Sequence, residues 1–275
     1  MNNLPVALQT YTVRDVAEGD FAGVMKQVKA IGYDYIEIGG LYRLTPKEYK
    51  EILDANGLRA ISAHVGIHEM INDTEGIASN YKFLGVDYLA IPYMPDELRP
   101  GRPGFDKIAE EIKRVGAIFK TYGITLIYHN HDFEFEKLPD GRYVLDALYE
   151  AIPADALETQ IDTCWCLVSG VDPAAYIRKY AGRCPVVHLK DFFKEGEAAD
   201  MYELMGQEET KGVKPKGIFE FRAVGHGVQN FPPILAASLE SGAKWVVVEQ
   251  DTPIAGCTSI EDAKKSRDYL KSLGW

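Results

Sequence analysis

Histidine and carboxylate side chains close an apolar run in the middle of the chain, residues 124–135, which reads ITLIYHNHDFEF. The apolar, β-branched start of this run predicts a buried strand. His129, His131 and Glu134 come at its end or just beyond, where folding alone rarely needs polar groups. Imidazoles and carboxylates bind divalent cations and transfer protons. We therefore expect this strand end to form one wall of a site.

Similar groups recur at the ends of other predicted strands. Five of the six histidines, all but His226, fall near strand ends or just after them. Asp162 and Glu249 also come at strand ends, where an unpaired buried carboxylate would be costly. Imidazoles and carboxylates that converge on one mouth suit Mn²⁺, Zn²⁺, Fe²⁺ or Co²⁺. The pattern predicts a metal site, and further polar groups at strand ends are Glu37, His64, His188 and Lys190.

The elements that must position these groups alternate regularly along the chain. Strands are predicted at 4–11, 35–38, 58–64, 88–91, the start of 124–135, 157–161, 185–189 and 245–249. Each is followed by a helical pattern, of which 46–56 and 259–273 are examples. This alternation predicts a single-domain (β/α)8 barrel over residues 1–275, in which the carboxyl ends of the strands share one mouth. The competing doubly wound sheet would carry GxGxxG after its first strand, and residues 9–15 (QTYTVRD) lack it.

Three other segments have a structural and a functional interpretation. The charged insertion at about 192–216 predicts either a solvated loop or a lid or oligomer contact. Cys164 and Cys166 lack a second pair, so we expect packing rather than redox chemistry or zinc binding, with Trp165 as an apolar wall against a sugar face. His226 lies between two glycines, and a solvated turn is the favoured interpretation.

Composition limits the partners. With 30 basic and 41 acidic residues, the formal net charge is −11, which disfavours nucleic acid binding. Four cysteines do not make a disulfide framework, and the first residues read directly as a strand, so we expect a cytoplasmic protein without an export signal. No apolar run is long enough to span a membrane. The composition is compatible with a homo-oligomer and does not decide the oligomeric state.

Five segments carry a resemblance to a known family. They are LQTYTVRD (8–15), YHNHDFEF (128–135), IDT (161–163), VHLKD (187–191) and VVEQD (247–251). With them, almost the whole chain resembles the xylose-isomerase-like TIM-barrel superfamily of sugar phosphate isomerases and epimerases. Inosose dehydratase, 3-dehydroshikimate dehydratase and endonuclease IV belong to the same superfamily.

The resemblance implies one divalent metal ion (Mn, Zn, Co, Fe or Mg), held by Glu, Asp, His and Glu from strands five to eight. The last three match Asp162, His188 and Glu249, whereas His129 stands where relatives often carry the first Glu. In the epimerases both glutamates exchange protons with the substrate, which a metal-bound histidine does poorly. The departure at His129 therefore weakens a two-base epimerase mechanism.

The implied reaction is proton removal next to the carbonyl of a keto-sugar, through an enediolate, which defines an isomerase or epimerase. We expect Glu249 to be the base, His131 (or His129) to return the proton, and Lys190 or His64 to stabilise the oxyanion. Expected substrate contacts are Glu37, Tyr11, Trp165 and Glu134. The absence of a glycine-rich phosphate cradle slightly favours an unphosphorylated sugar.

Three alternatives stay open. The first is a metal-dependent lyase or dehydratase acting on a keto-sugar or keto-glycoside, which gains from the missing strand-five Glu. The second is a sugar-binding barrel without activity, since fold alone does not give function. The third is an endonuclease IV-like phosphodiesterase, which the acidic net charge and the small number of candidate ligands disfavour.

Overall fold

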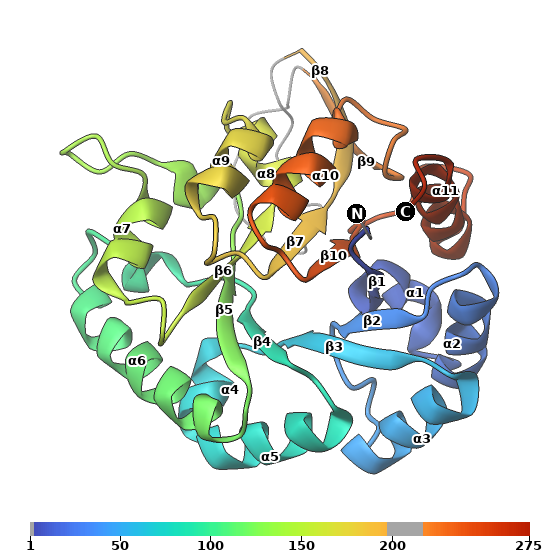
Figure 1. The fold of residues 1–275 in the computed structure, drawn as a ribbon, viewed down its shortest axis with the longest axis horizontal. Helices are drawn as coiled ribbons and strands as arrows, with labels where there is room; N and C mark the ends of the chain where they lie inside the picture. The colour runs from blue at the N-terminus through green and yellow to red at the C-terminus, as the bar shows by residue number, and fades with distance from the viewer. Residues whose placement is uncertain (1–2, 197–216) are drawn as a thin grey trace.

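The computed structural model describes residues 3–196 and 217–275. Parallel strands close into a barrel in the order β1-β10-β7-β6-β5-β4-β3-β2, surrounded by helices (Figure 1). The predicted (β/α)8 barrel is confirmed. The barrel strands are β1 (Val6–Gln9), β2 (Tyr35–Ile38), β3 (Arg59–His64), β4 (Tyr88–Ile91), β5 (Thr125–His129), β6 (Glu158–Asp162), β7 (Val186–Leu189) and β10 (Trp245–Val248).

The helices begin and end largely at residues whose local chemistry fixes them. Thr45 and Thr258 each form a capping box with the glutamate three residues later, and Gly57 ends α3 in the left-handed conformation. The helices are α1 (Arg14–Ala17), α2 (Phe21–Ala30), α3 (Pro46–Asn56), α4 (Ile67–Asn72), α5 (Thr74–Leu84), α6 (Phe105–Thr121), α7 (Val144–Ala151), α8 (Thr163–Val168), α9 (Pro173–Lys179), α10 (Phe231–Glu240) and α11 (Ser259–Ser272). Short 3₁₀ helices cover Thr10–Val13, Asp96–Leu98 and Phe133–Phe135. None of these described helices is long and apolar enough to cross a membrane.

The barrel interior is layered. A buried apolar layer is formed by Ala7, Ile61, Ala90, Ile127, Val186 and Val247. Side chains two residues apart on a strand point to the same face. On four of these strands, the residue two positions further along therefore also points inward. These four residues are polar, namely Gln9, His129, His188 and Glu249. The apolar layer thus supports a polar layer on the side of the strand ends.

A second small sheet follows β7, where the sequence predicts only an irregular insertion. Strands β8 (Asp191–Glu195) and β9 (Ile218–Arg222) pair antiparallel. Phe192, Phe219 and Phe221 pack with Trp165 in one apolar cluster, which explains why this charged segment starts and ends as strands. The rest of the insertion, 197–216, lies outside the described residues, so its expected role as a loop, lid or oligomer contact stays a prediction.

Candidate functional site

Four buried residues converge at the carboxyl ends of the barrel strands. His129 ends β5, Asp162 ends β6, His188 lies in β7 and Glu249 follows β10. Each offers a ligand atom, and these atoms all lie within 4.8 Å of one another. This set, which we call the four-residue cluster, comprises the residues expected to bind metal.

Asp162 provides the clearest test of whether the cluster fits a cation. Its Oδ1 atom accepts hydrogen bonds from the backbone N–H groups of Cys164 (2.7 Å) and Trp165 (3.1 Å), and so caps α8. Its Oδ2 atom is buried and has no hydrogen-bond partner among the described residues. Burial raises the pKa of Asp162 to about 7. A buried, unpaired carboxylate oxygen is costly, and a divalent cation would satisfy it.

His129 is oriented by a neighbouring amide. Its Nδ1 atom lies 3.2 Å from Oε1 of Gln160, which leaves Nε2 facing Asp162 Oδ2 at 3.9 Å and Glu249 Oε2 at 4.0 Å. Two ligands at about 2.1 Å from one ion lie roughly 3–4 Å apart, so this spacing suits a shared cation. Burial holds the pKa of His129 well below its usual value, so the imidazole is neutral and can be a ligand.

His188 lies between two carboxylates. Its Nδ1 atom is 3.0 Å from Oε2 of Glu249, and its Nε2 atom is 2.6 Å from Oε1 of Glu37. Burial alone would lower the pKa of His188, but Glu37 and Glu249 outweigh it and raise the pKa to about 10. A divalent cation at Nδ1 would displace the proton from that nitrogen. The carboxylate of Glu37 on the far nitrogen is the usual support for such a ligand.

Glu37 is the centre of a buried hydrogen-bond network. Besides His188, it accepts hydrogen bonds from Gln9 (2.8 Å), Ser62 (2.5 Å) and Gln160 (2.6 Å), and His64 Nε2 lies 3.1 Å away. Burial would raise its pKa, but the neighbouring His64 and His188 hold the pKa well below its usual range. Both oxygens are occupied by protein groups and the residue does not line the cavity, so this arrangement gives no support to a substrate contact at Glu37.

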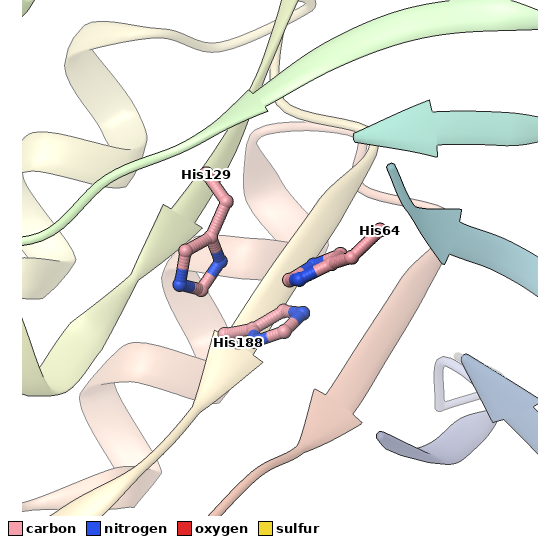
Figure 2. A group of neighbouring side chains, drawn as sticks. All are labelled: His64, His129 and His188. Carbon is pink, nitrogen blue, oxygen red and sulfur yellow. The ribbon is translucent and has the colours of Figure 1, made fainter. Parts of the chain in front are cut away.

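Three imidazoles meet above Glu37. Figure 2 shows His64, His129 and His188 pointing toward one another from β3, β5 and β7. The rings of His64 and His188 are nearly parallel, with an interplanar angle of 12° and centroids 5.4 Å apart. His64 is held beside the four-residue cluster by its Nε2 atom, which lies 2.8 Å from Oε1 of Gln160 and 3.1 Å from Oε1 of Glu37.

A cavity of about 600 Å³ opens over the cluster. We call it the first cavity. Among the expected site residues, those that line it are Tyr11, His64, His129, His131, Lys190 and Glu249. Its volume is in the range of small-molecule sites, and its position at the strand ends is where barrel enzymes bind substrate.

Lys190 and Glu249 form an ion pair in the wall of the first cavity. Lys190 Nζ lies 3.3 Å from Glu249 Oε2 and 2.8 Å from Asp251 Oδ1. Burial would lower the pKa of Lys190, but Asp251 and Glu249 raise it above its usual value. Burial would raise the pKa of Glu249, but Lys190 and His188 keep it well below its usual range. The cavity therefore presents an ionised carboxylate beside a fixed cation.

Two of the expected substrate contacts lie behind the cavity wall. Trp165 is fully buried in the aromatic cluster, and the Lys190 ammonium lies 5.2 Å from its ring centroid. Glu134 accepts hydrogen bonds from Tyr128 (2.5 Å) and from the backbone N–H of His131 (2.7 Å). Neither residue lines the first cavity. Their contacts therefore favour a role in positioning Lys190 and His131, rather than direct contact with the substrate.

The outer histidines differ in surroundings. His131 lines the first cavity with a buried Nδ1 atom that has no hydrogen-bond partner in the described part of the chain. Burial lowers its pKa to about 3, so the imidazole is neutral. His68 and His226 are exposed and do not line the cavity. Asp251, which the sequence places beside Glu249 after the last barrel strand, also lines the cavity. The sequence pattern missed the amides Gln9 and Gln160, which the two-residue period of the strands could have indicated.

A parallel eight-stranded barrel with a buried His, Asp and Glu cluster under a cavity at its strand ends defines a TIM-barrel protein with a candidate metal site. A family model described as xylose isomerase-like TIM barrel matches residues 25–273. The chain belongs to this family.

Relatives in this family include enzymes. The inosose dehydratase of Geobacillus kaustophilus is 23% identical over 275 residues, which cover 91% of this chain and 86% of the relative. A solved structure of a sugar phosphate isomerase/epimerase from Parabacteroides distasonis shares the fold with a TM-score of 0.78 and 24% identity, over 99% of this chain and 95% of that one. A xylose isomerase-like TIM barrel protein from Mycobacterium smegmatis, solved in complex with magnesium, aligns with a TM-score of 0.71 and 16% identity, over 99% and 98% of the two chains.

Proposed function

We propose that the protein is a divalent-metal-dependent enzyme that removes a proton from the carbon next to the carbonyl of a keto-sugar, as an isomerase or epimerase. The observation that carries this proposal is the double position of Glu249. Its carboxylate belongs to the four-residue cluster and also lines the first cavity, where the ammonium of Lys190, 3.3 Å from Oε2, favours its ionised form. A base is thus available beside the place where a carbonyl would be polarised.

Each residue has a chemical role in this proposal. When bound by His129, Asp162, His188 and Glu249, a divalent cation supplies polarisation of the substrate carbonyl. Glu249 accepts the proton as the C–H bond breaks, and the electron pair moves to the carbonyl oxygen. The ammonium of Lys190 stabilises the resulting negative charge, and His64 and His131 can hydrogen-bond sugar hydroxyls from the cavity wall. Delivery of the proton to the former carbonyl carbon, with the hydroxyl proton of the neighbouring carbon passing to the former carbonyl oxygen, gives an isomer. Delivery of a proton to the opposite face of the same carbon, for which His131 in the cavity wall is the candidate donor, gives an epimer.

Dehydration of a keto-sugar is the second candidate, and His129 favours it. The imidazole is neutral, buried and directed at the cluster, so strand five offers no second carboxylate base. Elimination needs one base, and the hydroxyl on the carbon beta to the carbonyl leaves as water when it takes up a proton, which the protonated Glu249 can return. The similarity to inosose dehydratase points the same way.

Proton exchange tests the proposal and separates the two outcomes. The protein is incubated in D₂O with Mn²⁺ or Mg²⁺ and a panel of keto-sugars and inososes, and deuterium incorporation and products are followed by NMR. We expect exchange at the carbon next to the carbonyl, with a new isomer for an isomerase and loss of water for a dehydratase. Glu249→Gln should slow exchange by about 10²–10⁴-fold, whereas the exposed Glu136→Gln should not. Sugar binding without exchange or product would contradict the enzymatic proposal.

A further inference from the structure

A second cavity, of about 630 Å³, adjoins the first. The two cavities share Tyr11, Gly39 and Asp251 in their walls. The first cavity alone has room for a small-molecule ligand, so a single sugar ring above the four-residue cluster leaves the second cavity without an occupant.

The wall between the two cavities is held firmly. The guanidinium of Arg14 lies 3.8 Å from the ring centroid of Tyr11, and its Nη1 atom donates to the backbone oxygens of Tyr11 (3.0 Å) and Asp251 (2.6 Å). These contacts tie the segment after β1 to the segment after β10. Gly39 allows the loop after β2 to approach closely, because a Cβ atom there would lie 2.7 Å from the Tyr11 backbone nitrogen.

The same loop carries backbone strain at the second cavity. Tyr42 (φ 49°) and Arg43 (φ 63°) are consecutive non-glycine residues in the left-handed region, and both line the second cavity. Tyr42 is fixed by donating its hydroxyl to the Thr10 backbone oxygen at 2.9 Å. Arg43 is exposed, and within the described residues it has no hydrogen-bond or ion-pair partner. Strain of this kind is costly and is concentrated at binding sites.

The lining of the second cavity suits a neutral group with many hydroxyls. It combines two arginines with three carboxylates and two tyrosines, namely Arg14, Arg43, Asp15, Glu18, Asp251, Tyr11 and Tyr42. Sugar hydroxyls both donate and accept hydrogen bonds, so they can use both kinds of charged group. A phosphate would meet more carboxylates than cations.

We propose that the substrate is a keto-sugar that carries a second sugar unit. Its keto ring occupies the first cavity, and the second unit occupies the cavity lined by Tyr42 and Arg43. The choice of the keto ring as the reacting ring rests on the proposed function. The preference for a second sugar unit is a property of binding and can be measured by itself.

Calorimetric titration of the Mn²⁺-loaded protein tests the inference. The probes are D-fructose, three glucosyl-fructoses that differ in linkage (isomaltulose, turanose and leucrose) and D-fructose 6-phosphate. We expect at least one disaccharide to bind about tenfold more tightly than D-fructose, and Arg43→Gly to remove most of that gain, as loss of a charged hydrogen bond does. Glycine also relieves the strained backbone, so the Tm of this variant should not fall.

The control variant removes an equivalent charge nearby. Lys47, whose side chain is 77% exposed on α3, does not line either cavity, and Lys47→Ala should keep the full disaccharide gain. The inference is overturned if no disaccharide binds more tightly than D-fructose, if Arg43→Gly keeps the gain, or if D-fructose 6-phosphate binds most tightly and loses affinity in Arg43→Gly. Deuterium exchange on the same sugars separates the proposals. Exchange without a disaccharide preference overturns this inference alone, and a disaccharide preference without exchange overturns only the proposed reaction.

Discussion

His188 is the residue on which the candidate metal site depends most, because both of its ring nitrogens lie beside carboxylates. His188→Ala should lower Mn²⁺ affinity by more than about 100-fold, since loss of a ligand exceeds the 10–100-fold effect of losing a supporting group. Metal content after dialysis, measured by mass spectrometry, checks this. His226→Ala, at an exposed position, is the matched control. Full metal retention by His188→Ala would overturn the site.

Glu37 should act through His188 rather than on substrate. Glu37→Gln removes the charge that faces His188 Nε2 at 2.6 Å but keeps the size of the side chain. We expect Mn²⁺ affinity to fall about 10–100-fold, with the ligands still in place. Titration with Mn²⁺, monitored by water-proton relaxation, measures the change in affinity. The control is Glu51→Gln, at a side chain that is 65% exposed. An unchanged affinity would show that the network serves folding alone.

The sequence pattern predicted a metal site among the polar groups at the strand ends, because the carboxyl ends of parallel barrel strands share one mouth. The choice of His129, Asp162, His188 and Glu249 among those groups came from the family resemblance. The pattern could not rank Glu37, Trp165 and Glu134, since direct contact and support from behind require the same residue types. Their role depends on which side of the cavity wall the side chain lies, which only packing decides. Gln9 and Gln160 drew no attention because neutral amides carry no distinctive chemistry until a buried carboxylate lies next to them.

At the scale of elements, α7 and α9 are joined by one carboxylate. Asp146 accepts hydrogen bonds from Tyr176 (2.8 Å), Tyr180 (2.7 Å) and Lys179 (2.6 Å). Burial would raise its pKa, but the hydrogen bonds from Lys179, Tyr180 and Tyr176 lower it. A lowered folded-state pKa means that the stabilisation is fully present above the unfolded value of about 3.9 and is lost as pH falls through the folded-state pKa.

Asp146→Ala should therefore destabilise the protein in a pH-dependent way. At pH 7 we expect a loss of about 1–3 kcal/mol in the free energy of unfolding, because buried hydroxyls lose their acceptor. The difference from wild type should shrink below about pH 4. Urea denaturation at several pH values measures it, with the exposed Asp155→Ala as control. A pH-independent difference would contradict the role of the charge.

The barrel strands were predictable because buried parallel strands read as apolar runs of distinctive length. The elements that were missed are those whose formation depends on distant partners. Strands β8 and β9 form where Phe192 and Phe221 meet Trp165. Nothing local in the sequence distinguishes these pairings from a charged loop.

For the whole molecule, cation binding should be coupled to stability. A ligand that binds only the folded state stabilises it by about 2.7 kcal/mol at 100 times its Kd, which corresponds to roughly 5–10 °C in Tm for a chain of this size. Thermal denaturation with Mn²⁺ against EDTA measures the shift. His188→Ala should abolish it, and an equal shift in that variant would place the cation elsewhere.

The layers of the barrel interior determine the order in which cation and sugar can bind. The apolar layer of Ala7, Ile127 and Val247 blocks the barrel below the four-residue cluster, and the first cavity lies above it. Among the described residues, the first cavity is therefore the route by which cation, sugar and water reach the cluster. The proposed cation must enter before the sugar, and a bound sugar should trap it, so that EDTA strips the metal more slowly as the sugar concentration rises. In kinetic terms, binding and release should be ordered: the cation binds first and leaves last.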